Sequence, residues 1–349
     1  RGVAVAGTHG KTTTTAAIAF VLRSAGWDPS FLIGGAVPQL GGSAGFGHGE
    51  VFVVEACEYD RSFLNYRPEV AVVTNIDADH LDYYKDLEEI DQAFRRFASG
   101  SGYVVGCGDD PRARLVAGRF GGGCTTYGFS EGCWWRLGDL VQETGGSRYR
   151  LASQGETLEL STPLAGVHNA LNAAAAAVAC RKLGLGAAEV ARGLAAFRGA
   201  GRRLERLGEV RGIAVYDDYG HHPREIACTL EALRQRHPGR PVRVIFQPHQ
   251  FHRTRVFLAE FARVLSRGAE ETVVPGIYGA RAGAGDPDSV GAGDLVRAIA
   301  SAGGKAREAE GLEAAARAVA LSARPGDVVL NLGAGDIGTL APRLLDLLR

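Results

Sequence analysis

The sequence contains no methionine, only four lysines and no long hydrophobic run. Because an initiator methionine is missing, we expect Arg1 not to be the natural start of the protein. The longest apolar run, residues 173–180, is far shorter than the ~20 residues that a membrane-spanning helix needs. No basic segment followed by an apolar stretch opens the chain, which is the pattern of a secretory signal. These absences predict a cytoplasmic protein that is not inserted into a membrane.

An excess of charge of either sign is also absent. Lysine plus arginine and aspartate plus glutamate each number 39, so the formal net charge is zero. Proteins that coat nucleic acid or are held on a membrane surface by charge carry excess positive charge. The balance predicts no nucleic-acid partner, and it leaves room for a local basic pocket that binds a phosphorylated ligand.

The six cysteines form no Cys-x-x-Cys pair, and no histidine follows them at zinc-finger spacing. A disulfide framework or a structural zinc site would need such spacings. The cysteines are therefore predicted to be free thiols in a reducing compartment.

The length of 349 residues is about twice that of a typical single domain of ~150 residues, which predicts two domains. The 46% of hydrophobic residues suffices to build two cores. We place the boundary in the glycine-rich, basic segment 197–203, which gives domains at 1–200 and 201–349.

Hydrophobic patterning predicts an α/β protein in both parts. The first part shows strand patterns at 3–6, 51–55 and 70–75, helix patterns at 16–25, 87–98 and 169–183, and an antiparallel patch within 124–160. The second part shows strand patterns at 213–217, 242–246, 272–274 and 328–332 and helices from Pro223, from Thr254, near Asp294, near Leu312 and at the C-terminus. Such alternation predicts a second, doubly wound unit with a parallel sheet.

A glycine-rich loop follows the first predicted strand and reads Gly7-Thr8-His9-Gly10-Lys11-Thr12-Thr13. In such a loop backbone N–H groups surround phosphates, the lysine reaches the terminal phosphates, and the threonine hydroxyl can bind Mg²⁺. The general pattern needs glycine at position 5, where Val5 stands, so the loop is a shorter variant. The alternative is a chance Gly-Lys-Thr in a surface turn, but the position directly after a buried-type strand favours phosphate binding.

Two acidic segments follow the next predicted strands. Glu55 ends the run 51–55, and Asp77, Asp79, His80 and Asp82 lie within segment 74–82. Carboxylates at the carboxyl ends of parallel strands lie where α/β sheets bind ligands. Oxygen ligands and one imidazole near a triphosphate suit Mg²⁺, whereas the alternative for each segment is a solvated loop.

Asn169 and Asn172, three residues apart, share one face of the alanine-rich helix. Paired amides could bind the edge of a purine. The alternative is capping of the helix N-terminus, for which asparagine is a favoured residue, and composition alone favours this alternative.

Two loops in the second part are rich in charged and aromatic side chains. One reads Asp217-Asp218-Tyr219-Gly220-His221-His222-Pro223, and the other reads Gln247-Pro248-His249-Gln250-Phe251-His252-Arg253-Thr254-Arg255. Histidine and arginine at two strand ends suit an anionic substrate. Again the alternative is a pair of solvated loops.

Taken in order, these motifs resemble those of the Mur ligases, the ATP-dependent amide-forming enzymes of peptidoglycan synthesis, and in particular of the alanine-adding member. The resemblance covers residues 1–349. It implies a central P-loop ATPase-like domain with a mostly parallel sheet and a small antiparallel patch, followed by a Rossmann-like C-terminal domain that binds the amino acid. It also implies ATP and Mg²⁺ as cofactors and UDP-N-acetylmuramate and L-alanine as substrates, joined through an acyl phosphate.

The resemblance assigns roles to individual residues. Lys11 and the loop residues would stabilise the transferring phosphoryl group, and Thr12, Glu55 and His80 would hold magnesium. Asn169 and Asn172 would meet the adenine, and Arg203 and Asp218 would approach the nucleotide when the domains close. His221 and Arg253 would face the acyl phosphate and the incoming amino acid. The nucleotide-binding set is then Gly7, Thr8, His9, Gly10, Lys11, Thr12, Thr13, Asn169, Asn172, Arg203 and Asp218.

Two departures from the family pattern stand out. Many relatives carry arginine where this chain has Gln250. The family also holds the uridine nucleotide in a domain of about a hundred residues before the phosphate loop, whereas this chain opens directly on that loop. We therefore expect the 349-residue chain alone to be inactive as a ligase.

Two kinds of alternative remain. One is a sister ligase, either the enzyme that reattaches recycled murein peptides to UDP-N-acetylmuramate or a folate polyglutamate ligase. The motifs that contain Asp218 and Arg253 favour the alanine-adding enzyme. A nucleotide-binding module without ligase activity is the alternative from another class.

Overall fold

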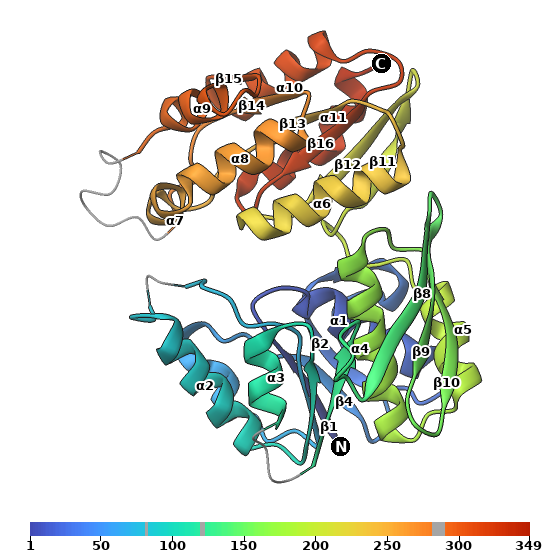
Figure 1. Ribbon diagram of the computed structural model, residues 1–349. Coiled ribbons are helices and arrows are strands. Elements are labelled where there is room, and N and C mark those ends of the chain that lie inside the picture. Colours follow the sequence, from blue (N-terminus) through green and yellow to red (C-terminus); the bar gives the residue numbers. More distant parts are fainter. Residues whose placement is uncertain (81–82, 119–122, 281–289) are drawn as a thin grey trace. The chain divides into compact units, whose positions relative to one another are not determined.

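The structure, a computed structural model, describes residues 1–80, 83–118, 123–280 and 290–349 and divides into two compact units. The first unit is Arg1–Gly201 and the second is Arg202–Arg349 (Figure 1). Both are α/β, as predicted.

The first unit is built on a ten-stranded sheet with a parallel centre. The strand order is β10-β9-β8-β7-β6-β5-β1-β4-β2-β3. The central strands, parallel to one another, are β2 (Ser30–Val37), β4 (Phe52–Glu55), β1 (Gly2–Ala6), β5 (Val70–Val73), β6 (Tyr103–Cys107) and β7 (Cys124–Gly128). The carboxyl ends of β1, β4 and β5 therefore meet at one edge, which brings the phosphate loop, Glu55 and segment 74–80 together.

Both ends of this sheet are antiparallel. A hairpin at one edge pairs β3 (Gly42–Gly45) with β2. At the other end β8 (Trp135–Glu143), β9 (Gly146–Ala152) and β10 (Thr157–Thr162) form a meander. The predicted antiparallel patch is confirmed for β8 to β10, but it was wrong for β7, which pairs parallel to both β6 and β8. The segment 124–128 contains glycine and two threonines, so it lacks the continuous apolar run that is typical of a parallel strand.

Five α-helices and two short 3-10 helices accompany the described part of this sheet. They are α1 (Lys11–Ser24), α2 (Leu87–Ser99), α3 (Pro111–Gly118), α4 (Val167–Leu183), α5 (Ala187–Ala196), η1 (Pro38–Leu40) and η2 (Tyr59–Asn65). Helix α1 packs against α4 and α5, while α2 packs against α3. Gly26, predicted to end the first helix, does so with φ 81° as its N–H bonds the Arg23 carbonyl at 3.0 Å.

The second unit is a six-stranded sheet in the order β11-β12-β16-β13-β14-β15. Its strands are β11 (Glu205–Val210), β12 (Ile213–Asp218), β13 (Val242–Phe246), β14 (Glu271–Val274), β15 (Ala306–Glu308) and β16 (Val328–Leu332). All neighbouring pairs are parallel except β11–β12. The helices are α6 (Pro223–Arg236), α7 (Phe251–Val256), α8 (Leu258–Gly268), α9 (Ala292–Ser301), α10 (Gly311–Ser322), η3 (Asp336–Leu340) and α11 (Ala341–Leu347).

Strand β12 shows why this sheet is covered on both faces. Ala214 and Tyr216 belong to the core shared with α6, α8 and α9, whereas Ile213 and Val215 belong to the core shared with α10 and α11. Successive side chains of a strand point to opposite faces, so a strand that is apolar throughout needs helices on both. The doubly wound prediction is confirmed.

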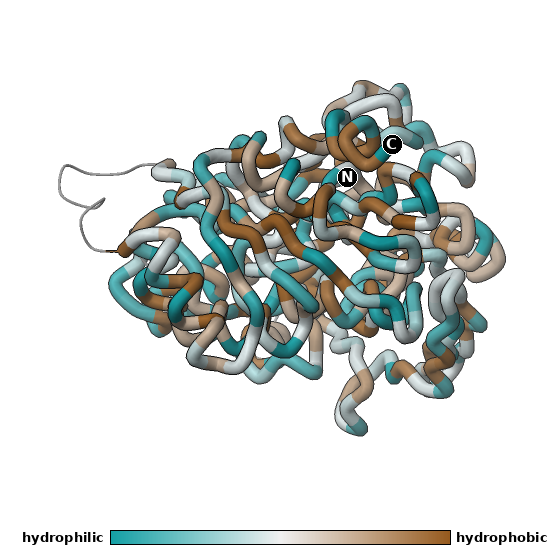
Figure 2. Tube along the Cα trace, turned by 90° about the horizontal axis from the view of Figure 1, so that it is seen from above, coloured by the Kyte–Doolittle hydropathy of each residue, from teal (hydrophilic) through white to brown (hydrophobic). Residues whose placement is uncertain are grey.

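Hydrophobic and hydrophilic stretches alternate along the trace, as the patterning requires (Figure 2). The helix predicted from Thr254 begins earlier, at Phe251, and a second helix follows it at Leu258. Strands β2, β3, β6, β11 and β15 and helices α3 and α5 were not predicted. Within the described ranges, no helix is both long and apolar enough to cross a membrane.

Candidate active site

The loop between β1 and α1 has the backbone that a phosphate-binding loop needs. Gly7 and Gly10 have φ of 136° and 83°, a region that residues with a side chain rarely adopt. A Cβ at Gly7 would lie 2.0 Å from the Thr74 hydroxyl oxygen, and one at Gly10 would lie 2.4 Å from Oδ1 of Asn172. Glycine is therefore required at both positions for steric and conformational reasons.

Segment 74–77, which follows β5, holds this loop in place. The Thr8 N–H donates to the Asn75 carbonyl at 3.0 Å, and the His9 N–H donates to Asn75 Oδ1 at 2.8 Å. The Thr74 hydroxyl donates to the His9 carbonyl at 2.6 Å, and the Asp77 N–H donates to the Thr8 hydroxyl at 2.8 Å. These residues thus have a structural role in shaping the loop.

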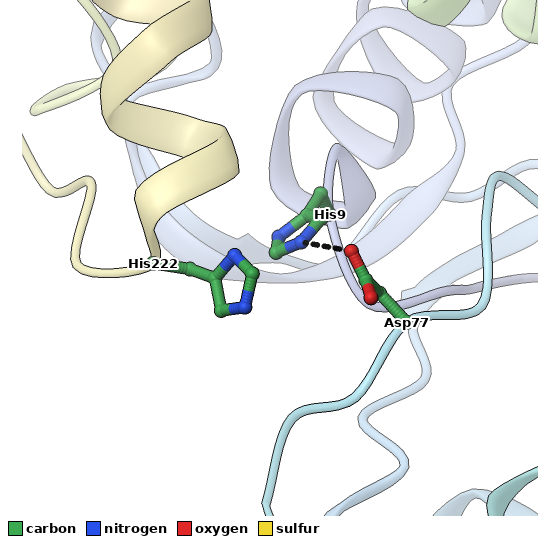
Figure 3. A group of neighbouring side chains, drawn as sticks. All are labelled: His9, Asp77 and His222. Atoms are coloured by element: carbon green, nitrogen blue, oxygen red, sulfur yellow. Dashed lines mark ion pairs between the residues drawn. The ribbon is translucent and has the colours of Figure 1, made fainter. Parts of the chain in front are cut away.

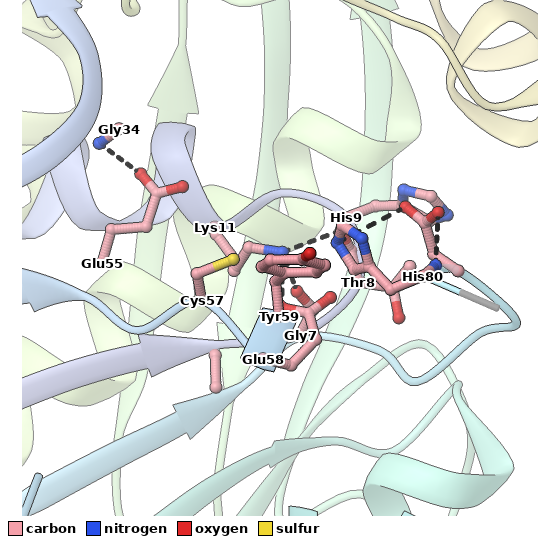
Figure 4. A network of polar contacts seen from close by, with 12 residues as sticks. Gly7, Thr8, His9, Lys11, Gly34, Glu55, Cys57, Glu58, Tyr59 and His80 are labelled. Atoms are coloured by element: carbon pink, nitrogen blue, oxygen red, sulfur yellow. Dashed lines mark hydrogen bonds and ion pairs between the residues drawn. The ribbon is translucent and has the colours of Figure 1, made fainter. Parts of the chain in front are cut away.

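The Lys11 ammonium folds back over the loop. Its Nζ donates to the carbonyls of Gly7 and Thr8 at 2.6 and 3.1 Å and to Glu58 Oε2 at 2.9 Å (Figure 4). Burial alone would lower the pKa of Lys11, but the negative groups around it, Glu58 first and then Cys57 and Glu55, together outweigh burial and raise the pKa. The lysine is therefore charged at neutral pH.

Glu58 was not singled out by sequence reasoning. Its side chain is only 3% exposed and forms the ion pair with Lys11. Two features of the sequence could have pointed to it. Glu58 follows Glu55 by three residues at the same strand end, and the chain contains only four lysines with which a buried carboxylate could pair. The hydrophobic pattern of the sequence does not show which lysine forms an ion pair with Glu58.

Glu55 and Thr12 lie together, as predicted. The Thr12 hydroxyl donates to Glu55 Oε1 at 3.0 Å, and the Gly34 N–H donates to Glu55 Oε2 at 2.7 Å. The carboxylate ends β4 and is partly exposed. Its two oxygens and the adjacent hydroxyl form a hard donor set that suits Mg²⁺.

His80 lies in the same strand-end region, on the far side of Lys11 from Glu55 in Figure 4. Its ring packs 5.1 Å from that of Tyr59, and its buried Nδ1 has no hydrogen-bond partner among the described residues. Among the described residues, no hydrogen bond or ion pair joins His80 to Glu55 or Thr12, so the structure brings together two of the three predicted metal ligands. Leu81 and Asp82, part of the predicted acidic segment, lie outside the described residues.

Asn169 and Asn172 lie on one face of α4, as predicted, and both are buried. Asn172 Nδ2 donates to Asn169 Oδ1 at 3.4 Å, and Asn169 Nδ2 donates to the Ala165 carbonyl at 2.7 Å. The Asn172 amide adjoins Gly10 of the phosphate loop. Neither side chain caps the helix, whose N-cap is Gly166, so the capping alternative is wrong.

His9 of the phosphate loop pairs with Asp77 across the same edge. Its Nε2 lies 3.7 Å from Asp77 Oδ2 (Figure 3). His222, also drawn in Figure 3, belongs to the second unit, where its Nδ1 accepts the Arg224 N–H at 3.3 Å and caps α6. Pro223 begins that helix, as predicted.

In the second unit, two buried aspartates at the end of β12 bind two different sets of partners. Asp217 accepts from Arg202 Nε at 3.0 Å and from Asn331 Nδ2 at 2.8 Å. Asp218 accepts the N–H groups of Leu204 and Gly220 at 2.6 and 2.8 Å. Burial raises the pKa of Asp217, and it raises the pKa of Asp218 to about 6, although Arg203 opposes the latter shift.

The Asp218 pKa makes stability pH-dependent. Because the folded pKa of about 6 exceeds the ordinary 3.8, folding favours the protonated carboxyl, and this contribution is lost as pH rises from about 4 to above 6. Relative to Asp218→Asn, the wild type should lose up to about 3 kcal/mol across this window. Urea unfolding of both proteins at each pH measures the difference. Asp294→Asn is the control, since the Gly291 N–H and Arg297 lower the Asp294 pKa, and a difference of the same sign there would contradict the assignment.

The ends of β12 and β13 bring their two loops into contact. The rings of His221 and His249 lie 5.8 Å apart, His249 stacks on Tyr278 at 5.5 Å, and Arg253 Nη1 lies 3.2 Å from His249 Nδ1. Arg253 is buried, and Gln250 has φ 71° at the N-cap of α7. The predicted pair His221 and Arg253 is thus linked through His249.

Arg203 lies 5.1 Å from the Tyr219 ring and 4.0 Å from Glu225.

Both units match domains of a known protein family. Residues 5–180 match the Mur ligase middle domain, and residues 202–335 match the Mur ligase, glutamate ligase domain. The chain belongs to the Mur ligase family. The predicted resemblance is therefore confirmed at the level of the family.

Named relatives of this Mur ligase are similar over almost all of its length. The UDP-N-acetylmuramate--L-alanine ligase of Acidothermus cellulolyticus is 45% identical over 358 residues, which cover 100% of this chain and 74% of the relative. The protein of the same name from Desulfitobacterium hafniense is 39% identical over 341 residues, which cover 97% of this chain and 75% of the relative.

Solved structures of Mur ligases share the fold. The UDP-N-acetylmuramate-alanine ligase MurC from Thermotoga maritima matches with a TM-score of 0.83 at 29% identity over 99% of this chain and 75% of that one. The MurF ligase from Thermotoga maritima, solved in complex with ADP, matches with a TM-score of 0.73 at 20% identity over 99% of this chain and 79% of that one. The latter supports the fold alone.

Proposed function

We propose that this Mur ligase catalyses the ATP-dependent joining of L-alanine to the D-lactyl carboxylate of UDP-N-acetylmuramate. The observation that carries the proposal is the 45% identity, over the whole chain, to a ligase of that name. The phosphate loop supports it, because the Lys11 ammonium lies against the loop carbonyls and the Thr12 hydroxyl bonds Glu55 at the strand ends. In this proposal the first unit uses ATP and the second binds the amino acid.

In the first step the γ-phosphoryl group passes from ATP to the carboxylate, which breaks the terminal P–O bond and gives ADP and an acyl phosphate. Phosphoryl transfer depends mainly on positioning and charge neutralisation. Lys11 supplies a fixed positive charge, and the N–H groups at the start of α1 supply the positive end of a helix. Asn172, which lies beside Gly10, and its neighbour Asn169 are the proposed contacts of the adenine.

In the second step the amine of L-alanine attacks the acyl carbon, and the tetrahedral intermediate collapses to the amide and inorganic phosphate. His221 and Arg253 are the proposed residues that face the acyl phosphate and the amino acid, and His249 holds them in one group. Arg203 and Asp218 are proposed to approach the nucleotide; this stays a prediction.

Magnesium fits the residues present. The Glu55 carboxylate and Thr12 hydroxyl are adjacent oxygen donors, and His80 Nδ1, which has no hydrogen-bond partner in the described part of the chain, is a buried nitrogen in the same region. We propose these three as the residues that would hold Mg²⁺, which supplies neutralisation of phosphate charge when bound.

Glu55→Gln tests the metal assignment. We expect ATP affinity measured with Mg²⁺ to fall about tenfold or more, because a ligand loses its charge, and ATP affinity in EDTA to stay unchanged. Calorimetry under both conditions gives the comparison. Glu50→Gln, at an exposed carboxylate five residues earlier in the chain, is the matched control, and an equal loss with and without Mg²⁺ would contradict a metal-binding role for Glu55.

A product assay tests the proposed reaction. We would use a fusion protein in which residues 1–349 follow the N-terminal domain of the Acidothermus cellulolyticus relative. The fusion protein is offered ATP, UDP-N-acetylmuramate and a panel of L-alanine, glycine, L-serine, L-glutamate and a murein tripeptide. Preferential amide formation with L-alanine supports the proposal. Preference for the tripeptide favours a recycling ligase, and ATP binding without any amide favours a nucleotide-binding module.

A further inference from the structure

Glu58 is a buried carboxylate for which the proposed reaction has no role so far. It is 2% exposed, and its Oε2 accepts from Lys11 Nζ at 2.9 Å. Its other oxygen, Oε1, is buried without a hydrogen-bond partner among the described residues. An ionised group in such a place is costly unless it is paired, so the site depends on the Lys11 ammonium.

We propose that Glu58 is a positioning residue that aims the Lys11 ammonium at the transferring phosphoryl group. The inference rests on the proposed function. It assigns Glu58 no contact with ATP: Glu58 acts through Lys11 only.

The argument starts from the three N–H donors of the ammonium. They are directed to the Gly7 carbonyl, the Thr8 carbonyl and Glu58. A phosphate oxygen in the loop must take over one or two of these donors. Giving up a neutral carbonyl costs less than leaving the buried carboxylate unpaired, so Lys11 keeps Glu58 and turns its other donors to the phosphate.

The segment that carries Glu58 is held rigidly. The Tyr84 hydroxyl, itself buried, donates to the Glu58 carbonyl at 2.6 Å. Asp60 and Arg61, two and three residues after Glu58, have φ of 52° and 60°, two consecutive left-handed residues that are not glycine. Such strain persists only where the surroundings fix it.

The contacts of Arg61 help to hold this segment in its conformation. Its guanidinium pairs with Glu89 of α2 and lies 5.7 Å from the Tyr84 ring. The carboxylate is therefore set at one place relative to the loop, as a positioning role requires. Figure 4 shows Glu58 and Lys11 facing each other.

Glu58→Gln in the fusion protein tests the inference, because glutamine keeps the shape and an acceptor oxygen but removes the charge. We expect kcat for amide formation to fall tenfold or more, while the dissociation constant for ATP in the presence of Mg²⁺ changes less than threefold. A loss of positioning affects the transition state more than ground-state binding. An unchanged kcat, or equal loss of ATP affinity and kcat, would overturn the inference.

Two further variants separate this role from a structural one. Glu69→Gln removes a different carboxylate–cation pair of this unit, the one between the exposed Glu69 and Arg1, and should leave kcat unchanged. In a Lys11→Ala background, Glu58→Gln should cause no further loss of turnover, since its effect passes through Lys11. Additive losses in that double variant would overturn the inference.

The failure of the two proposals can be distinguished. If the wild-type fusion protein binds ATP but forms no amide with any substrate of the panel, the proposed function is wrong. If it forms the amide and Glu58→Gln equals the wild type, only the role of Glu58 is wrong.

Discussion

Replacement of Lys11 by alanine is expected to reduce amide formation by the fusion protein by roughly a hundredfold or more. The physical reason is that a single preorganised cation at the developing charge of a transition state contributes several kcal/mol. Initial rates of phosphate release and of amide formation, at saturating ATP, give the measurement. Retention of more than about a tenth of the wild-type rate would contradict the role of Lys11.

The Lys11→Ala variant needs a control for stability, because Lys11 forms a buried ion pair. The Lys11 side chain is 12% exposed and is paired with a carboxylate that is 3% exposed, a partner that the sequence alone did not reveal. Lys11→Ala leaves that carboxylate unpaired and can cost up to about 3–5 kcal/mol of stability. The double variant Lys11→Ala/Glu58→Gln removes both charges, so it should unfold at a higher temperature than Lys11→Ala and be equally inactive. Thermal unfolding of the three proteins separates lost chemistry from lost folding.

The polypeptide of residues 1–349, assayed without an added domain, is expected to bind Mg·ATP and to form amide more than roughly a hundredfold more slowly than the fusion protein. Lys11, Glu55 and Asn172 are in place around the phosphate loop, so nucleotide binding should be intact. In the family resemblance the uridine diphosphate is held by a domain that precedes the loop. Binding energy from a remote part of a substrate orients its reacting group, so losing it lowers the rate as well as the affinity.

Calorimetry with ATP and a product assay on the same preparation test both halves of this expectation. A control with Lys11→Ala in the 349-residue polypeptide shows whether the measured heat comes from the phosphate loop. Amide formation by the polypeptide within tenfold of the fusion protein would show that the two units hold the acceptor unaided. Absence of ATP binding would contradict the intact phosphate loop instead.

Sequence patterning was most successful where an element is buried on both faces or is bounded by a distinctive residue. The run 242–246 became β13 and the run 328–332 became β16 without change, because such strands are apolar throughout. Helix α6 begins at Pro223, whose fixed φ suits the first helical position. Strand β3, with two glycines and a serine in four residues, carries no such signal and exists because β2 lies beside it.

The site shows the same division. The sequence by itself determined the phosphate loop, since Gly7, Gly10, Lys11 and Thr12 are adjacent in the chain and their chemistry depends on local backbone geometry. It also placed Glu55, His80, His221 and Arg253 at strand ends, because a strand's carboxyl end follows from the run of apolar residues before it.

Only the tertiary structure decided which of these side chains meet. Thr12 reaches Glu55 because β1 and β4 are parallel neighbours, and Asn172 reaches Gly10 because α4 packs on α1. His249 joins His221 to Arg253 because β12 and β13 flank the same strand, β16. Glu58 was missed for the same reason: 47 residues separate it from Lys11, and their pairing depends on burial, which is a property of the folded chain and not of either sequence segment.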